Sequence, residues 1–475
     1  MPKFHRILYP LWISVVICIV LSSACAPLHM PSTTPQTKPE SSASPVATAT
    51  KAVPLTPTPT SAIQATEQEL QGLQLTLWHP WRGAEKETLN TLISEFNQSN
   101  PWGINVNALS IPGIDQLDQQ VQTVWGGEDT PNLVLAYAFQ AQNWQKIKPL
   151  VLNWQDYLQD PKWGLSEMEQ AQFFPSLWES SLVNGVRWGI PARRVGQILF
   201  YNASLAKELG FTTAPESSET FQKQACAAIL IDSQTKLPTR SGWYLDQDYP
   251  AILSWLIAFG VQPVRADSQG YQWNTPAALQ AFVFLRKLYD GGCTISSADV
   301  LPADALAQRQ ALFISANSGD IRTIQQAFQQ ASSRDQWTAI PFPPSAGEPK
   351  MLTYGVDYIL IQSSAPEQLA SWLFVKWMLS AEVQVKLAEK TSSLPLRSDA
   401  AESLKTSPHI PPVYSTLLNY LPYATPEPAL ASWNTVRWAV SDASKQLFAW
   451  YFTPDQAPTL AKLLQDTAQS FETQK

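Results

Sequence analysis

The alternation of apolar and polar residues near the start of the predicted folded part indicates a sheet with helices between its strands. Residues 73–78 and 104–109 alternate with the period of two that strands show, and 132–137 is a short apolar run typical of a buried strand. Between them, 83–96 and 114–125 carry apolar residues every three or four positions, on one helical face. The order β-α-β-α-β predicts an open parallel sheet with helices on both sides.

The mixed pattern continues along the rest of the chain, so the predicted fold class is α/β. The predicted strands are 186–191 and 196–202, and the predicted helices are 217–230, 276–290, 367–379, 382–390 and 459–471. About 400 residues follow the N-terminal segment, which is more than one hydrophobic core usually serves. The sequence therefore predicts two lobes.

The N-terminus has the pattern of a secretory signal peptide, predicted to span residues 1–24. A basic start precedes an apolar run, 7–21, which ends in small residues directly before Cys25. The run is shorter than the ~20 residues of a membrane-spanning helix. The small residues and Cys25 resemble a bacterial lipobox, although Ser22 stands where that motif usually has leucine. The resemblance implies cleavage before Cys25 and a diacylglycerol on its sulfur, and the alternative is an ordinary signal with an incidental cysteine.

Residues 25–72 are predicted to be a disordered spacer behind the lipidated cysteine. Positions 31–61 hold seven Pro, five Ser and eight Thr and no aromatic residue, so they cannot bury enough apolar surface to become ordered. We expect the folded part to begin near Leu73 and to lie on the extracytoplasmic face of a bacterial plasma membrane, anchored through Cys25.

The net charge bears on the binding partners, and the cysteine content bears on disulfide formation. The formal net charge is −7, which argues against nucleic acid as a partner. Cys226 and Cys293 remain in the predicted folded part. Outside the cytoplasm they either pair in a disulfide or stay as separate buried thiols, and both alternatives are open.

The sequence contains no G-x-S-x-G, H-E-x-x-H, G-x-G-x-x-G, P-loop or C-x-x-C motif. His79 and His409 are far apart in the sequence, so neither a His-based metal site nor a Ser–His–Asp triad is expected. No cofactor and no metal are predicted, and the chain is not predicted to be an enzyme. The many Asp and Glu keep one enzyme class open, a lipid-anchored polysaccharide hydrolase with a carboxylate pair.

A series of segments, taken in order, resembles the extracellular solute-binding proteins of bacterial ABC importers. The segments are LTLWHPWRGAEKETLNTLISEFN, INVNAL, TPNLVLAY, GIPARRVGQILFYNASLAKELGF, GDIRTI, YGVDYILI and SSLPLRSDA. The nearest branch is the sugar-binding one, typified by maltose-binding protein, and the resemblance covers nearly all of 73–475. It implies a monomeric capture protein that delivers a small solute to permease subunits in the membrane.

The resemblance also implies two α/β lobes joined by crossing strands, with a ligand cleft between them that closes on the solute. Residues 194–202 would make the first crossing and 354–360 the return. The expected lobe one is 73–193 plus 357–400, and the expected lobe two is 194–356 plus 401–475.

Ligands of open α/β sheets bind beyond the carboxyl ends of the strands. This rule selects His79, Trp81 and Arg82 after the first predicted strand and Tyr137 after the third. An aromatic ring such as that of Trp81 covers the apolar face of a sugar. His79 and Arg82 either hydrogen-bond the solute or belong to a solvated loop face.

Four further candidates flank the predicted crossings. Arg193 and Arg194 lie beside the first crossing, and Gly355 and Asp357 border the return. An arginine in the cleft donates two parallel hydrogen bonds to a planar or anionic group, or it pairs with a carboxylate across the hinge. Gly355 would let backbone approach the ligand closely.

Lobe two contributes Tyr249, Asn317, Asp320 and Trp433 as predicted ligand contacts. Tyr249 and Trp433 stand where the family places aromatic residues that stack on sugar, so their role rests on the resemblance. Asn317 and Asp320 precede a helix, and capping that helix is the alternative role of Asp320.

Two kinds of cargo are open for this fold. Aromatic plates with a hydrogen-bonding rim suit a sugar or oligosaccharide, which is the main prediction. Arg193 and Arg194 would instead suit an anionic solute such as glycerol phosphate.

Overall fold

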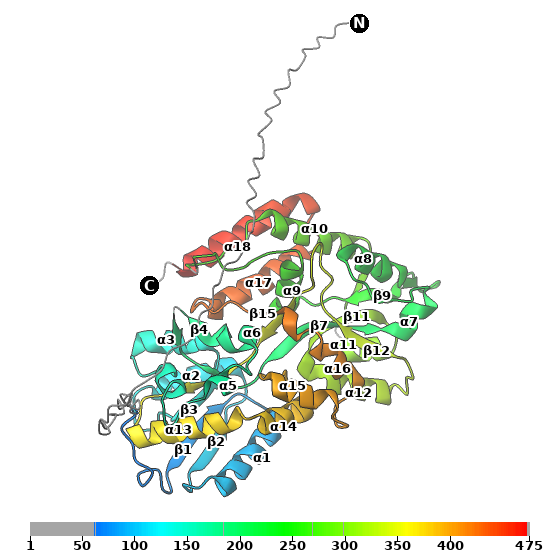
Figure 1. Cartoon of the computed structure of the whole chain (residues 1–475). Helices are drawn as coiled ribbons and strands as arrows, with labels where there is room; N and C mark the ends of the chain where they lie inside the picture. Colours follow the sequence, from blue (N-terminus) through cyan, green and yellow to red (C-terminus); the bar gives the residue numbers. More distant parts are fainter. Residues whose placement is uncertain (1–60, 62, 184, 268, 298, 473–475) are drawn as a thin grey trace, which may run out of the picture. The chain divides into compact units, whose positions relative to one another are not determined.

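The computed structural model describes residues 61, 63–183, 185–267, 269–297 and 299–472 (Figure 1). The predicted signal peptide, Cys25 and the spacer up to residue 60 lie outside the described residues. Within the described residues, no helix combines the length and the apolar character that crossing a membrane requires.

The first sheet has five strands. In order across the sheet they are β2 (Asn105–Ser110), β1 (Gln74–His79), β3 (Leu133–Ala136), β14 (Asp357–Leu360) and β6 (Ile190–Pro191). β1 runs parallel to both β2 and β3, which confirms the predicted parallel arrangement. β14 runs antiparallel to β3, so a distant part of the chain returns to complete this sheet.

Helices cover both faces of the first sheet. On one face lie α1 (Gly83–Ser99), α13 (Ala365–Met378) and α14 (Ala381–Thr391), and on the other lie α2 (Ile114–Val124) and α3 (Ala138–Ile147). Successive residues of a strand point to opposite faces, so Leu133 and Leu135 of β3 pack with the first set whereas Val134 packs with the second. The three helices of the first set contact one another (Figure 1).

The second sheet is larger and is centred on β7. Its strands are β10 (Thr294–Ile295), β9 (Pro238–Tyr244), β11 (Ala311–Asn317), β7 (Val195–Asn202), β13 (Met351–Tyr354) and β15 (Ala424–Pro426), while β12 (Trp337–Ile340) pairs with β7 and β8 (Leu230–Ile231) pairs with β9. β9, β10 and β11 run parallel, and β7 runs antiparallel to β11. Every residue of β7 is buried, as its apolar run predicts.

The second sheet is also covered on both faces. On one face lie α8 (Ser218–Ala227), α9 (Tyr249–Ala258), α10 (Pro276–Asp290), α17 (Trp433–Leu447) and α18 (Ala457–Glu472), and on the other lie α11 (Pro302–Ala307), α12 (Ile321–Gln330) and α16 (Pro412–Leu418). Leu199 and Tyr201 of β7 face the first set, and Ile198 and Phe200 face the second. In Figure 1, α17 and α18 lie side by side.

Short elements make up the connections. They are α4 (Gln155–Leu158), α5 (Glu167–Gln170), α6 (Pro175–Trp178), η1 (Glu179–Ser181), β4 (Leu182–Val183), β5 (Val186–Arg187), α7 (Ala203–Glu208), η2 (Ser318–Asp320), α15 (Ser398–Lys405), η3 (Leu421–Tyr423) and η4 (Pro454–Gln456). The single strand predicted over 186–191 is wrong, because Trp188 and Gly189 separate β5 from β6.

A disulfide joins Cys226 of α8 to Cys293, which follows α10. The structure thereby decides between the two alternatives that the sequence leaves open. The bond closes a loop with a sequence separation of 67 residues. In the chain-entropy model a loop of this length stabilises the fold by about 4 kcal/mol.

The chain passes between the two sheets at two adjacent places. β6 continues through Arg194 into β7, and β13 continues through Gly355 into β14. The crossings are hydrogen-bonded to each other, since the N–H groups of Ala192 and Arg193 donate to the carbonyl of Val356 at 3.0 and 3.3 Å. We call the body around the first sheet lobe one and the body around the second sheet lobe two, and the residue limits given above stay a prediction.

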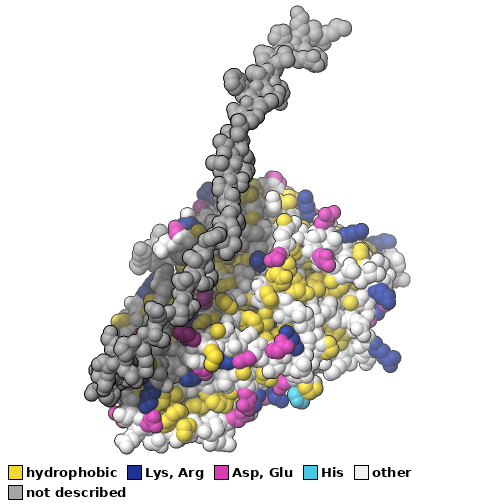
Figure 2. All heavy atoms as spheres, in the orientation of Figure 1, with side chains coloured by type: hydrophobic (Ala, Val, Ile, Leu, Met, Phe, Trp, Pro, Cys, Tyr) yellow, Lys and Arg dark blue, Asp and Glu magenta, His cyan; other side chains and the backbone are white. Residues whose placement is uncertain are grey.

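On the face of the molecule in Figure 2, acidic and basic side chains are interspersed among polar atoms. The described part of that face carries no continuous basic surface.

Candidate functional site

A cavity of about 530 Å³ opens in lobe two at the carboxyl ends of β9 and β11. We call it the lobe-two cavity. Its wall includes the loop after β9, the turn after β11 and the faces of α11 and α12. Because this is the end of the sheet at which α/β proteins bind ligands, the cavity is the first candidate for the solute site.

Asp246 enters this cavity from the loop after β9. Burial raises the pKa of the Asp246 carboxyl to about 7. The negative charges of Asp248 and Asp320 also raise this pKa, whereas the hydrogen bond from the Asp248 N–H lowers it. That N–H donates to Asp246 Oδ1 at 3.0 Å. The cavity therefore holds a carboxyl group that gives up its proton with difficulty.

Asn317 and Asp320 form the turn after β11. Asp320 Oδ2 accepts from the N–H of Asn317 at 3.1 Å and from its Nδ2 at 2.8 Å, and Asn317 Oδ1 accepts from the N–H of Gly319 at 2.8 Å. Burial raises the pKa of Asp320 in spite of the nearby Arg193. Both residues line the cavity while they also organise the turn, so the capping alternative and the ligand contact are compatible.

Gln197 and Tyr354 come from the two crossing strands and also line the cavity. Tyr354 donates its hydroxyl to Gln197 Oε1 at 3.1 Å. Gln197 is only 4% exposed, and its amide nitrogen has no partner among the described residues. This leaves a hydrogen-bond donor available to a bound molecule.

Beside the cavity, aromatic residues surround Glu427. Trp433 Nε1 donates to Glu427 Oε2 at 2.8 Å, and the Tyr249 hydroxyl donates to the same oxygen at 3.4 Å. Burial raises the pKa of Glu427 to about 7. The Tyr249 ring lies 6.4 Å from that of Tyr354, which connects this cluster to the cavity wall.

Trp433, which the resemblance suggests as a stacking residue, lies in this cluster. The side chain is fully buried, its ring stacks on Trp273 at 6.4 Å, and its N–H is already bonded to Glu427. No face of the ring remains for a ligand, so Trp433 belongs to the core of lobe two. Trp81 is likewise buried in the apolar cluster beneath α1.

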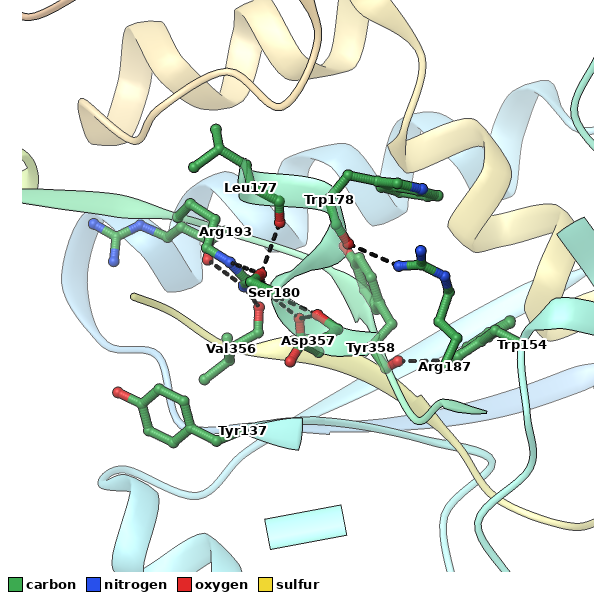
Figure 3. A network of polar contacts seen from close by, with 12 residues as sticks. Tyr137, Trp154, Leu177, Trp178, Ser180, Arg187, Arg193, Val356, Asp357 and Tyr358 are labelled. Carbon is green, nitrogen blue, oxygen red and sulfur yellow. Dashed lines mark hydrogen bonds and ion pairs between the residues drawn. The ribbon is translucent and has the colours of Figure 1, made fainter. Parts of the chain in front are cut away.

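Arg194 and Asp357 form a buried ion pair at the crossings, as Figure 3 shows around Asp357. The pair distance is 2.5 Å, and both side chains are 3% exposed. Arg194 also donates to Ser180 Oγ at 2.9 Å and to the Val356 carbonyl at 3.0 Å. These bonds engage the whole Arg194 guanidinium, and Asp357 Oδ1 accepts from both Arg194 and Ser181, so the arginine makes the carboxylate pairing across the hinge that the sequence left open.

Arg193 points the other way, toward Glu85 of α1 and the turn after β11. In Figure 3 its side chain extends away from the Asp357 network. It pairs with Glu85 of α1 at 3.3 Å, and its guanidinium lies next to Gly319 in the turn after β11. Arg193 thus connects lobe one to the rim of the lobe-two cavity.

Two other candidates of lobe one, His79 and Arg82, do not line the lobe-two cavity. His79 is buried, its Nδ1 accepts from the Trp81 N–H at 3.2 Å, and burial together with Lys86 lowers its pKa to about 4. Arg82 is exposed and donates to the Pro112 carbonyl at 2.8 Å. The structure does not bring His79 or Arg82 to the lobe-two cavity.

Tyr137 and Gly355 lie together in a small pocket between the crossings and the segment after β15. The Tyr137 ring stacks on Phe139 at 4.7 Å, and burial raises its pKa to about 12. A Cβ on Gly355 would overlap the Arg193 carbonyl oxygen. The close approach that needs glycine is therefore made by the other crossing, not by a ligand as predicted.

Lobe contacts also form on the side of α3 and α17. Gln142 Nε2 donates to the Ala429 carbonyl at 3.1 Å, and Asn143 Nδ2 donates to the Ala431 carbonyl at 3.3 Å. Arg437 of α17 pairs with Asp115 at 3.2 Å and lies over the Tyr137 ring. Apolar contacts accompany these bonds, since Phe139 of α3 belongs to the core cluster of lobe two and Tyr137 packs against that cluster.

A second cavity, of about 550 Å³, lies between Glu179–Leu182 and the segment after α9. Its charged lining residues are Glu179, Lys350 and Glu427. It lies away from the carboxyl ends of β9 and β11, so we rank it behind the lobe-two cavity. In the part of the chain that the structure describes, no three His, Cys, Asp or Glu side chains are grouped to hold a metal ion.

Sequence reasoning missed Gln197, Asp246, Asp304 and Tyr354 as cavity residues. Asp246 follows a parallel strand, so the rule of carboxyl ends would have selected it if β9 had been predicted. The sequence does hint at a role for Gln197, because it is a polar residue within the largely apolar strand β7.

Comparison with known proteins supplies the family. The profile described as bacterial extracellular solute-binding protein matches residues 91–412. A comparison with curated proteins gives no match.

Solved structures match over both lobes. The cyclic alpha-maltosyl-1,6-maltose binding protein from Arthrobacter globiformis has a TM-score of 0.70 at 16% identity, with 85% of this chain and 100% of that chain covered. The maltose/maltodextrin-binding domain MalE from Bdellovibrio bacteriovorus, bound to maltotriose, has 0.64 at 21%, with 84% and 100% covered. UgpB from Mycobacterium tuberculosis, in complex with glycerophosphocholine, has 0.67 at 17%, with 84% and 98% covered.

At these identities the solved structures establish the two-lobe fold and nothing finer. The family profile adds the class of protein, since it extends from α1 in lobe one to the start of α16 in lobe two. Because it spans more than half of the 475 residues, the chain belongs to the bacterial extracellular solute-binding protein family.

Proposed function

We propose that the protein captures a sugar or oligosaccharide between its lobes and delivers it to the permease of an ABC importer. The observation that carries the proposal is the lobe-two cavity, which combines apolar walls with carboxyl and amide side chains and lies at the carboxyl ends of the strands. Arg193 and Glu85 bring lobe one to its rim. The ligands named for the maltose-binding and maltodextrin-binding neighbours support a carbohydrate.

The lining suits the hydroxyl rim of a sugar. Asp320 and Asn317 offer acceptors, and the unpartnered Gln197 amide offers a donor. A buried polar group without a partner costs about 1–3 kcal/mol, so a solute with matching hydroxyls gains from this site what an apolar solute does not. Tyr354 supplies an aromatic ring to the cavity wall, and the Tyr249 ring lies 6.4 Å behind it.

The lining does not favour the anionic alternative, glycerol phosphate. The lobe-two cavity has four carboxyl groups, those of Asp246, Asp248, Asp304 and Asp320. Arg194, which would have held the phosphate, is paired with Asp357. Arg193 alone remains at the rim, and it is paired with Glu85.

Thermal-shift and calorimetric titration of the purified protein test the proposal. A panel of neutral mono- and oligosaccharides should contain a ligand that stabilises the fold by mass action, ~2.7 kcal/mol at a hundred times its Kd. Glycerol phosphate should not shift the melting temperature, and chromogenic glycosides should not be cleaved. Stabilisation by glycerol phosphate alone, or turnover of a glycoside, would replace capture of sugar with one of those alternatives.

A variant pair locates the binding site. Gln197→Leu removes the donor that faces the lobe-two cavity, and we expect at least tenfold weaker binding, or about 1.4 kcal/mol. Gln98→Leu changes the same residue type on the exposed side of α1 and should bind as the wild type does. Equal loss in both variants would place the site elsewhere.

The anchor is proposed as well. A diacylglycerol on Cys25 and a spacer would keep the binding lobes near the permease at a high effective concentration. The full chain expressed in a bacterium should partition into detergent with the membrane fraction, and Cys25→Ala should release a soluble monomer. Membrane retention of Cys25→Ala would contradict the lipid anchor.

A further inference from the structure

A side chain of lobe one is buried in the core of lobe two. Phe139 belongs to α3, and two later residues of that helix, Ala141 and Trp144, pack in the apolar cluster between α2 and the first sheet. Phe139 itself is only 2% exposed and belongs to the core cluster of lobe two, which also contains residues of α9 and α17. The helix is therefore fixed to lobe one, while its Phe139 ring is inserted into lobe two.

Arg437 of α17 meets this ring from the side of lobe two. Its guanidinium carbon lies 5.4 Å from the centre of the Phe139 ring and 5.4 Å from that of the Tyr137 ring, and the two rings stack on each other at 4.7 Å. The Arg437 side chain is buried, and its Nη2 pairs with Asp115 of α2 at 3.2 Å. A cation over aromatic faces is attracted more strongly when it is removed from water. Arg437 thus connects lobe two to the start of α3 and to α2.

These residues lie apart from the candidate solute site. The described lining of the lobe-two cavity includes none of Tyr137, Phe139 and Arg437. Tyr137 and Phe139 line the small pocket beside Gly355, whose volume is about 20 Å³. A space of that size holds a water molecule but not a sugar ring. The contacts between α3 and α17 therefore do not depend on a solute in the lobe-two cavity.

Separation of the lobes would withdraw Phe139 from the core of lobe two. Because α3 is packed on the first sheet, it would move with lobe one, and both the ring and the apolar side chains around it would become exposed to water. The Arg437 guanidinium would lose the two aromatic rings and the Asp115 carboxylate. Closure regains these interactions whether or not a solute is bound.

We propose that Tyr137, Phe139 and Arg437 form a latch that holds part of the ligand-free protein closed. Such a latch raises the affinity for solute without touching the solute, because the closed form that the solute favours is already populated. Phe139 and Arg437 are thus positioning residues for capture. The effect on affinity rests on the proposed function, whereas the closed population of ligand-free protein does not.

Small-angle X-ray scattering of the full chain without any solute tests the latch. The N-terminal segment is the same in every sample, so a difference in radius of gyration between variants reports the lobes. Phe139→Ala should increase the radius of gyration over the wild-type value, because loss of a buried phenylalanine lowers the ratio of closed to open molecules about tenfold. An unchanged radius of gyration for the folded variant overturns the latch and leaves the proposed function standing.

The matched control is Phe448→Ala. Phe448 is buried in the same core cluster, and its ring contacts those of Trp243 and Tyr289, which both belong to lobe two. This variant should lower the melting temperature, as Phe139→Ala does, but keep the wild-type radius of gyration. An equal increase in both variants would reflect a general loss of stability and overturns the latch. Phe139→Leu keeps an apolar side chain and should give an intermediate value, and it decides the question if Phe139→Ala does not fold.

Titration calorimetry with the neutral sugar panel, which includes maltotriose, measures the effect on capture. A sugar that binds the wild type should bind Phe139→Ala about tenfold more weakly, since less of that variant is closed beforehand. Arg437→Met should weaken binding in the same direction. Equal affinity in wild type and Phe139→Ala overturns the role of the latch in capture. Binding of no sugar by the wild type overturns the proposed function, while the scattering comparison still decides the latch.

Discussion

At the scale of single residues, two buried acids make the stability of the protein depend on pH. Burial raises the pKa of Glu427 from 4.5, and that of Asp246 from 3.8, to about 7. At pH values between the ordinary pKa of about 4 and the raised pKa of about 7, the folded protein binds more protons than the unfolded chain does. Stability therefore falls as the pH rises from about 4 to about 7, and the penalty is complete above that window.

Glu427→Gln should remove this penalty at one of the two positions. The amide keeps an oxygen for Trp433 Nε1 and the Tyr249 hydroxyl but cannot ionise. We expect a melting temperature at pH 8 that is about 2–4 °C above that of the wild type, and no difference near pH 4. Scanning calorimetry between these pH values measures it. Glu402→Gln, on the exposed side of α15, is the control, and a constant offset at all pH values would contradict the explanation.

The Arg194–Asp357 pair is a buried ion pair whose disruption should lower stability. Arg194→Met leaves the Asp357 carboxylate buried without its partner, which costs about 3–5 kcal/mol in buried pairs of this kind. Urea unfolding should show that loss. Arg193→Met is the matched control, since the pair with Glu85 is more exposed and is worth about 1 kcal/mol or less. Equal losses would mean that Arg194 is not the structural arginine of the two.

The sequence could not distinguish these two arginines, because adjacent residues of an extended segment point to opposite sides. Which side meets Asp357 depends on the return crossing, far away along the chain. The burial of Trp433 could not be predicted for a related reason. A late helix with several tryptophans predicts aromatic packing, but only the positions of Trp273 and Glu427 decide that this ring is in the core.

At the scale of elements, the long periodic segments were predictable and the short ones were not. The strands and helices from β1 to β3 follow the predicted order, since each has one period and one buried face. The segment between α3 and β6 is different. Its helices α4, α5 and α6 have four residues each, too few to show a helical period. The parallel strand β9 was also missed, and with it the acid that follows.

The crossings depend on Gly355. Its φ of 154° is rare for other residues, and a Cβ there would overlap the Arg193 carbonyl oxygen. Gly355→Ala should therefore separate the two crossings and cost at least about 2 kcal/mol more than a strained φ alone. Gly347→Ala supplies that reference, because its φ is 77° and nothing would contact the new methyl group. Similar melting temperatures for both variants would show that the crossings tolerate the side chain.

At the scale of the whole molecule, the chain passes between two sheets at paired crossings, and the two lobes also touch through polar bonds and through Phe139. Gln142 and Asn143 of α3 hydrogen-bond the segment before α17, and Phe139 of the same helix packs in the core cluster of lobe two. The two-lobe architecture followed from the order of the motifs along the chain. The cavity did not, because it is built from strands and turns that meet only after folding.

Solute binding should change the arrangement of the lobes. A ligand that contacts both Asp320 of lobe two and Arg193 at its rim favours the conformation in which the lobes are closest. Small-angle X-ray scattering should show a smaller radius of gyration with a saturating ligand than without it. The Gln197→Leu variant at the same ligand concentration should keep the ligand-free value. An identical curve for the wild type with and without a bound ligand would contradict closure.

The bond between Cys226 and Cys293 has a consequence for when the molecule matures. Cysteine thiols stay reduced in the cytosol, so the disulfide of lobe two forms only after export. Protein purified from a reducing cytosol would have the same fold without the disulfide, and its lobe two would be less stable. Formation of the disulfide during secretion would therefore complete the folding of lobe two, on the extracellular side where this family binds solutes.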